Sequence, residues 1–370
     1  MNALRNAAFV LSWLIAIAPV RAATPVTIAQ LEQFLTSKQA MKDSDEEIAD
    51  RLNRVSLSQE LAGPTLARIV AETNSRPKTA EQIELLAAES IFDPAPIADQ
   101  PSDPVPDLVA QKQMLEAARG YVNGTLRLLP DLLAVRVTRS FNNTITDLKS
   151  KHGKPKVQTR FVGEYRREIA YRDGHEIVSA MGPRSGSSDA PVQGLSTWGE
   201  FGGILRIVLK DAFSGGVAWD RWQRNEAGEQ VAVFHYVIPE MSSHYKVDFC
   251  CYLLSRENPV ELPFSAKPGY HGEIYVDPRD GSIGRITVEA DMKETDAVRR
   301  SAIAVQYGPV EIGGKRFNCP IRGIAITESH NAMMEPVDGV GLEKHTNLVE
   351  FVNYHKFGST SRMLPGMNDR

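Results

Sequence analysis

The sequence lacks the residue patterns that usually reveal an enzyme or a metalloprotein. Its eight histidines include no HExxH or HxH motif and no Cys–His spacing suited to a metal ion. A GxSxG nucleophile elbow is absent, which removes the common serine-hydrolase signature. The turn that holds Asp277 and Asp280 has no downstream bidentate glutamate, so it does not fit a calcium loop. These absences favour a non-catalytic protein that needs no cofactor and no metal.

Long apolar runs are absent after the first 22 residues. No later segment approaches the roughly 20 apolar residues that a membrane-spanning helix needs. At the start, Arg5 precedes an apolar run over residues 7–18, and residues 19–22 end in small side chains. This is the pattern of a cleaved export signal. We therefore expect a signal peptide over residues 1–22 and a secreted or periplasmic mature protein without a transmembrane segment.

Positive charge is in slight deficit. Removing residues 1–22 takes Arg5 and Arg21 from the 42 basic residues and leaves 40 against 46 acidic ones, a net charge of about −6. A mildly acidic exported protein is a poor binder of nucleic acid. We therefore expect no nucleic-acid partner.

Cysteine is scarce, with three residues in the chain. If strand alternation holds, Cys251 shares an apolar face with Val247 and Phe249, Cys250 faces the other way, and Cys319 lies among apolar neighbours. Because export implies an oxidising compartment, this parity predicts a disulfide between Cys251 and Cys319, worth roughly 4 kcal/mol on the loop-entropy model. A bridge from Cys250 to Cys319 would refute the parity argument. The alternative is three buried free thiols that act as small hydrophobic side chains.

Capped helices dominate the first part of the mature chain. Within residues 23–92, four helical patterns begin with a spacing typical of a capping box, in which two side chains three residues apart satisfy each other's backbone amides. The four capping residues are Thr27, Ser44, Ser56 and Thr79. Residues 93–106 are rich in proline and predict an extended linker. We expect a small helical module over 23–92 that is separated by this linker from a second domain.

Residues 107–357 predict an antiparallel sheet domain. After a helix over about 107–127, strand-like runs are joined by short turns such as 173–174 and 313–314, which favour antiparallel pairing over βαβ crossovers. A helix over 198–213 interrupts the strands, and its apolar stripe must lie on the sheet. Residues 358–370 are predicted to be a disordered tail. The predicted fold class is α+β: a small N-terminal helical module plus a curved, half-barrel-like antiparallel β-meander covered by helices.

The strongest hairpin signal lies in residues 270–291, but its register is open. A five-residue loop would put Ile274, Val276, Ile286 and Val288 on one shared face. A four-residue loop would instead pair Val276 with Ile283.

Several stretches resemble a group of uncharacterised exported bacterial proteins, over the second domain and more faintly over the first. They are LPD at 129–131, WGEFG at 198–202, VFHY at 233–236, HY at 244–245 and the hairpin 272–289. This group carries no established activity. More distantly, a helix followed by a curved meander with an inserted helix resembles the half-barrel of periplasmic lipoprotein carriers and related envelope-stress sensors. That resemblance implies a concave apolar face that holds acyl chains beneath a helix.

Three functional hypotheses follow. The first is a non-catalytic exported protein that binds an apolar ligand, a lipid or a lipidated partner between the sheet and the helix over 198–213. Its lining would be Phe201, Leu205, Val208, Val233 and Phe234. The alternative is a protein-interaction or envelope-structural module that docks a protein partner on the N-terminal helices. The third is an exported hydrolase with a dispersed triad, because triads are recognised by geometry rather than by order.

Overall fold

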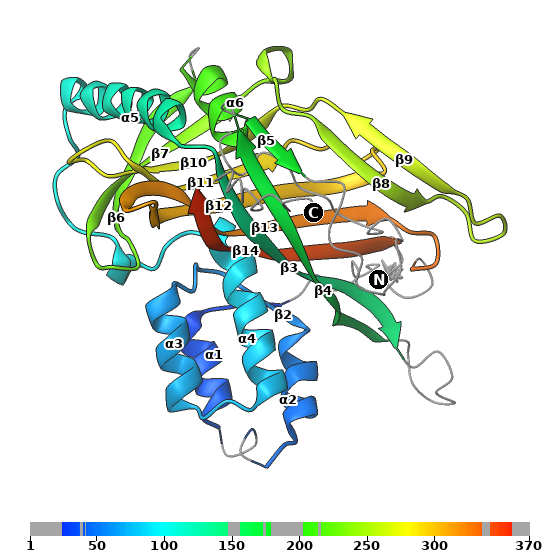
Figure 1. Ribbon diagram of the computed structural model, residues 1–370. Coiled ribbons are helices and arrows are strands. Elements are labelled where there is room, and N and C mark those ends of the chain that lie inside the picture. Colours follow the sequence, from blue (N-terminus) through cyan, green and yellow to red (C-terminus); the bar gives the residue numbers. More distant parts are fainter. Residues whose placement is uncertain are drawn as a thin grey trace, which may run out of the picture.

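An open antiparallel sheet forms the body of the protein in the computed structural model (Figure 1). The structure describes residues 24–37, 40, 42–146, 156–172, 175–178, 203–213, 216–334 and 341–356. Within them, the ten strands of the sheet lie in the order β5 (His175–Val178), β4 (Lys156–Arg172), β3 (Leu132–Thr146), β14 (Leu342–Lys356), β13 (Lys315–His330), β12 (Val298–Ile312), β11 (Ile283–Ala290), β10 (Tyr270–Val276), β7 (Gln230–Ile238) and β6 (Val217–Arg224). All neighbouring strands in this order are antiparallel. The predicted α+β class with an antiparallel meander is confirmed.

The N-terminal helices lie together on one side of the sheet (Figure 1). They are α1 (Ile28–Leu35), α2 (Asp45–Leu52), α3 (Gly63–Glu72) and α4 (Pro77–Glu89), and a short parallel pair, β1 (Thr24–Val26) and β2 (Val55–Leu57), runs between them. Their apolar faces meet in a core of their own, which includes Leu31, Leu52, Ile69 and Ile83. A separate core of this kind is what short amphipathic helices of about two to four turns need, because they gain most of their stability from packing.

Two of the four predicted capping boxes are formed. Thr27 and Ser44 accept hydrogen bonds from the backbone amides three residues later and cap α1 and α2. The other two predictions are wrong. Ser56 lies inside β2, and Thr79 lies within α4, whose first residue is Pro77. The amides of Lys78 and Thr79 donate instead to the Asp45 carboxylate of α2, at 3.0 and 2.9 Å, so a neighbouring helix supplies the cap.

Acidic side chains of this helical module face basic side chains of the sheet. The Arg139 guanidinium on β3 donates to both carboxylate oxygens of Glu84, at 2.9 and 3.0 Å. On β14, Lys344 Nζ donates to both oxygens of Glu89, at 2.7 and 2.9 Å. The module therefore contacts the sheet through charge-assisted hydrogen bonds, which are stronger than neutral ones.

Asp93 lies in the same contact region, and its titration predicts a pH-dependent stability. Burial raises the pKa of Asp93 to about 6, against the opposing charge of Arg300. Since this folded-state pKa lies above the unfolded value of 3.8, the stability contributed by the protonated carboxyl is lost as pH rises through 6. We expect Asp93→Asn to gain about 1 kcal/mol of unfolding free energy at about pH 8, after allowance for solvent screening. The gain should shrink towards zero near pH 4, and urea titrations at both pH values would measure it. If the difference in unfolding free energy between Asp93→Asn and the parent protein were the same at both pH values, the raised pKa of Asp93 would be contradicted.

The opposite face of the sheet is apolar and is covered by two helices, α5 (Leu108–Leu128) and α6 (Gly203–Ala212) (Figure 1). Met114, Ala118 and Val122 of α5 are buried in this core. The helix predicted over 107–127 matches α5. Of the helix predicted over 198–213, α6 is the part that the structure describes; residues 198–202, the signal peptide and the predicted tail lie outside the described residues. Among those residues, no helix combines the length and the hydropathy that crossing a membrane requires.

The linker connects the module on one face with α5 on the other. It contains a 3₁₀ turn, η2 (Ile97–Asp99), and passes beside β6 (Figure 1). The Trp222 indole Nε1 of β6 donates to the Pro104 carbonyl at 3.1 Å, and this hydrogen bond holds the linker against β6.

The hairpin of β10 and β11 combines both predicted registers. Ile274 pairs with Ile286 and so shares its face, as predicted for a five-residue loop, whereas Val276 pairs with Ile283, as predicted for a four-residue loop. A register shift between Tyr275 and Val276 makes both pairings possible. Gly281 ends the turn at φ +74°, a conformation that glycine adopts without a steric penalty.

Candidate functional site

The interface between α6 and the sheet is the candidate binding site. Leu205 and Val208 of α6 are 6% and 0% exposed, and they belong to one core cluster with Phe234 of β7, which is 0% exposed. The structure thus brings together three of the five predicted lining residues. Their side chains are buried against other apolar groups of the core, so a ligand reaches this face only if α6 moves away.

One predicted lining residue does not join them. Val233 lies on the other face of β7, where it clusters with Val231 and Tyr275, so its assignment to the site is wrong. The error arose because β7 is apolar on both faces, and strand alternation then sends Val233 and Phe234 to opposite sides. Phe201 lies outside the described residues.

One buried carboxylate fastens the end of α6. Asp211 is 3% exposed, and its Oδ2 accepts from the backbone amide of His244 at 2.8 Å and from the Tyr270 hydroxyl at 2.8 Å. His244 Nδ1 lies 2.6 Å from the other Asp211 oxygen. We call Asp211, His244 and Tyr270 the α6 latch. It joins α6 to β10 and to the segment before β8 (Val247–Leu253) at the point where the apolar core ends.

The chemistry of the α6 latch is that of a structural clamp. Burial raises the pKa of Tyr270 well above its usual value, and the hydrogen bond to Asp211 adds to the effect, so the phenol stays a donor. The half-exposed His244 ring turns its Nε2 towards Lys210 Nζ, at 3.2 Å. Within the described chain, this ring contacts Asp211 and Lys210, and neither is the serine, threonine or cysteine that serves as the nucleophile of a catalytic triad. The arrangement positions α6 but does not by itself assemble a catalytic triad.

Sequence reasoning missed the α6 latch. Asp211 and His244 are 33 residues apart, and no motif spacing links them. A signal was nevertheless present, because Asp211 lies on the apolar face of α6 in its last turn, and a buried carboxylate needs polar partners.

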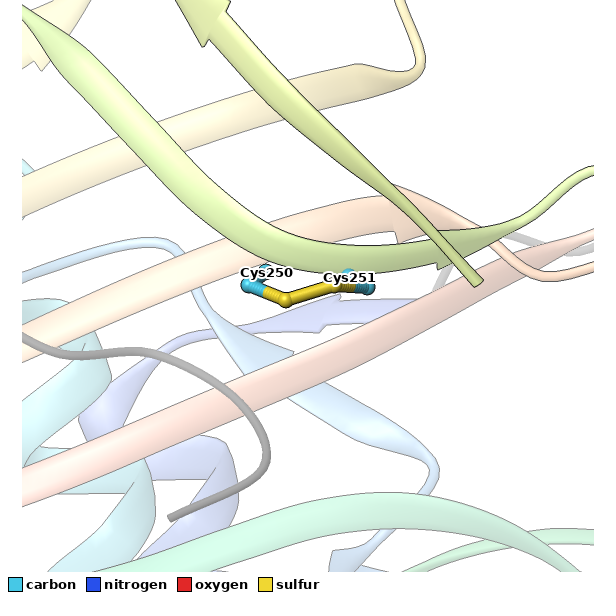
Figure 2. Close-up of a disulfide and its surroundings, with 2 residues drawn as sticks. All are labelled: Cys250 and Cys251. Carbon is cyan, nitrogen blue, oxygen red and sulfur yellow. A yellow bond between two sulfur atoms is a disulfide. The ribbon is translucent and has the colours of Figure 1, made fainter. Parts of the chain in front are cut away.

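The three cysteines pair differently from the prediction. Cys250 and Cys251 are joined by a disulfide between neighbouring residues of β8 (Figure 2), and Cys319 is a buried free thiol. The predicted Cys251–Cys319 disulfide is therefore wrong. The parity argument assumed a regular strand, whereas the pairing of β8 with β9 (Glu261–Ala266) shifts register between Phe249 and Tyr252.

The described part of the chain holds no group of three or more histidine, cysteine, aspartate or glutamate residues placed to bind a metal ion. No family model matches this chain, and neither a curated protein nor a solved structure matches it. The resemblance to exported bacterial proteins and to lipoprotein carriers therefore stays a prediction, and function is inferred from geometry alone.

Proposed function

We propose that this is a non-catalytic exported protein that binds an apolar chain, such as a lipid acyl chain, between α6 and the sheet. One observation carries the proposal: α6 lies on the apolar face through aliphatic side chains, and the α6 latch attaches one end of the helix to the sheet through polar groups. A helix held in this way can be exchanged for a ligand of the same apolar character, because hydrophobic burial is not directional.

The magnitudes allow such an exchange. Lifting α6 from the sheet would expose four large aliphatic side chains, Ile204, Leu205, Val208 and Leu209, at a cost of roughly 1.5–3 kcal/mol for each. A chain of about 16 carbons recovers about 0.8 kcal/mol for each buried CH₂, or roughly 12 kcal/mol when fully covered. Burial of the ligand can therefore offset the loss of the helix contacts.

Two tryptophans offer a local test of this proposal. Trp219 and Trp222 of β6 pack against the same core, with ring centroids 4.8 Å apart, and the Trp219 ring lies 5.5 Å from that of Phe234. The expected mature chain lacks Trp13, so these two tryptophans report on the site alone once Trp198 is replaced by phenylalanine. We expect 9,10-dibromostearate to quench their fluorescence at saturation, whereas unbrominated stearate should bind without quenching.

A matched pair of variants tests the role of the α6 latch. Asp211→Asn removes the charge that accepts from the His244 and Tyr270 donors, which should weaken the attachment of α6 to the sheet by about 1–1.5 kcal/mol. Because the ligand then displaces α6 more easily, the apparent affinity for dibromostearate should rise up to roughly tenfold. Asp248→Asn, an exposed change on β8 that leaves α6 untouched, should not alter it. Absence of quenching in the parent protein would refute the proposed site, and equal affinities in both variants would refute the role of the α6 latch.

Docking of a protein partner on the N-terminal helices has less support. Glu84 and Glu89 of that module are engaged with the sheet. The exposed aliphatic side chains nearest in sequence belong instead to the linker and the start of α5, at Ile97, Val105 and Leu108.

A further inference from the structure

Cys250 and Cys251 lie where the pairing of β8 with β9 is irregular. Phe249 pairs with Phe264 and Tyr252 with Leu262, so the two cysteines stand opposite Pro263 alone. Proline has no amide hydrogen to donate to a ladder, which favours a bulge at this point. Neighbouring side chains of a regular strand point to opposite faces. Here the two sulfur atoms lie together beside the strand (Figure 2).

The pair is accessible, whereas the third cysteine is not. Cys250 is exposed and Cys251 is half-buried. Cys319 is 0% exposed, and burial raises the pKa of its thiol to about 12. Because the thiolate is the reactive form, Cys319 is inert at neutral pH. A reductant or a thiophilic reagent therefore meets Cys250 and Cys251 first.

We propose that Cys250 and Cys251 form a redox-gated binding site for thiophilic ions. As a disulfide, the site is closed, since neither sulfur can be a thiolate ligand. Two molecules of a small thiol reductant open it: they leave as their own disulfide, and each protein sulfur gains one proton. The resulting dithiol offers two soft sulfur ligands to a soft metal ion or to trivalent arsenic.

Adjacency is what makes the reduced pair a site rather than two separate thiols. Once the first sulfur has bound, the second binds intramolecularly, at an effective concentration in the millimolar range or above. With an arsenic(III) oxide R–As=O, each of the two thiols forms one As–S bond, and their two protons leave with the oxygen as one water molecule. Loss of either sulfur removes this chelation.

Phenylarsine oxide is the probe that tests the proposal on the full chain. Protein reduced with a phosphine and desalted should take up one equivalent by intact mass, and the oxidised protein none. Tryptic mapping should place the adduct on residues 247–256, which contain both cysteines, and not on 317–322, which contain Cys319. This mapping needs no variant and so does not depend on how variants fold.

Matched variants complete the test. Cys319→Ser should bind phenylarsine oxide like the parent, whereas Cys250→Ser and Cys251→Ser should each bind at least roughly 100-fold more weakly, through loss of the second sulfur. Three results would overturn the proposal: no adduct on the reduced protein, an adduct that maps to Cys319, or equal uptake by the oxidised and reduced forms.

Discussion

Glu60→Ala is expected to lower the free energy of unfolding by about 3–5 kcal/mol, because it leaves the Arg285 guanidinium buried without its counter-charge. Glu60 lies between β2 and α3, and Arg285 lies on β11; their side chains are 9% and 8% exposed. The two guanidinium nitrogens Nη1 and Nη2 donate to the two carboxylate oxygens of Glu60. Urea denaturation followed by circular dichroism would measure the loss.

Neighbouring groups keep this ion pair in place. Gln223 of β6 donates to Glu60 at 3.1 Å, and the Arg285 guanidinium lies 3.8 Å from the centroid of the Tyr275 ring. Two groups of elements, the helical module and three strands of the sheet, therefore share one buried charge pair. The pair couples the module to the sheet, so its loss should affect both.

Two controls make the Glu60 prediction specific. Glu32 pairs with Arg68 on the surface, with side chains 34% and 45% exposed, so Glu32→Ala should cost no more than about 1 kcal/mol. The double variant Glu60→Leu/Arg285→Met removes both charges and should recover most of the stability lost in Glu60→Ala. If Glu60→Ala itself stays within about 1 kcal/mol of the parent protein, the ion pair is not buried as described.

Gly272→Ala is expected to lower the free energy of unfolding by about 3 kcal/mol or more, because no space exists for a methyl group on this residue of β10. A Cβ atom there would lie 2.0 Å from the Thr287 carbonyl oxygen of β11 and 2.8 Å from the Tyr236 hydroxyl of β7. That hydroxyl crosses β10 to donate to the Thr287 carbonyl at 2.5 Å. The absence of a side chain at Gly272 is therefore what allows β7 to bond to β11 across the strand between them.

Gly284→Ala is the matched control for this prediction. Gly284 lies on β11, and a Cβ atom there would meet nothing within 4 Å. Gly284→Ala should therefore alter the free energy of unfolding by no more than about 0.5 kcal/mol. Thermal unfolding of both variants beside the parent protein gives the comparison. Similar midpoints for Gly272→Ala and Gly284→Ala would show that the three-strand contact is not formed.

The parts of the fold that depend on local patterns were predictable from the sequence. The capping boxes at Thr27 and Ser44 and the antiparallel meander follow from spacings within a few residues of each other. The strand order was not predictable in the same way. β3 pairs with β14 and β10 with β7, and each of these contacts joins segments that are far apart in the sequence.

Errors arose where a regular period was assumed across an irregular element. The cysteine pairing followed strand parity, and the register shift at Cys250 and Cys251 breaks that parity. Val233 was placed with Phe234 because both are apolar, although a single strand presents them to two different cores. The Asp211–His244 contact depends on where α6 docks on the sheet, which the residues around either side chain do not encode.

The linker runs along one edge of the sheet and so affects whether that edge can pair with a strand of another molecule. An open sheet has two edge strands whose free backbone groups can pair with another chain and start aggregation. Beside β6 runs a segment that contains Pro101, Pro104 and Pro106 (Figure 1), and proline has no amide hydrogen with which to extend a ladder. On the opposite edge, β5 pairs with only the last four residues of β4. There the remaining length of β4 is rich in charge, with Arg160, Glu164, Arg166, Arg167 and Glu168. Proline beside β6 and charge along β4 both disfavour intermolecular strand pairing, whereas the exposed Phe161 and Val162 are the apolar side chains that the charged residues of β4 must offset.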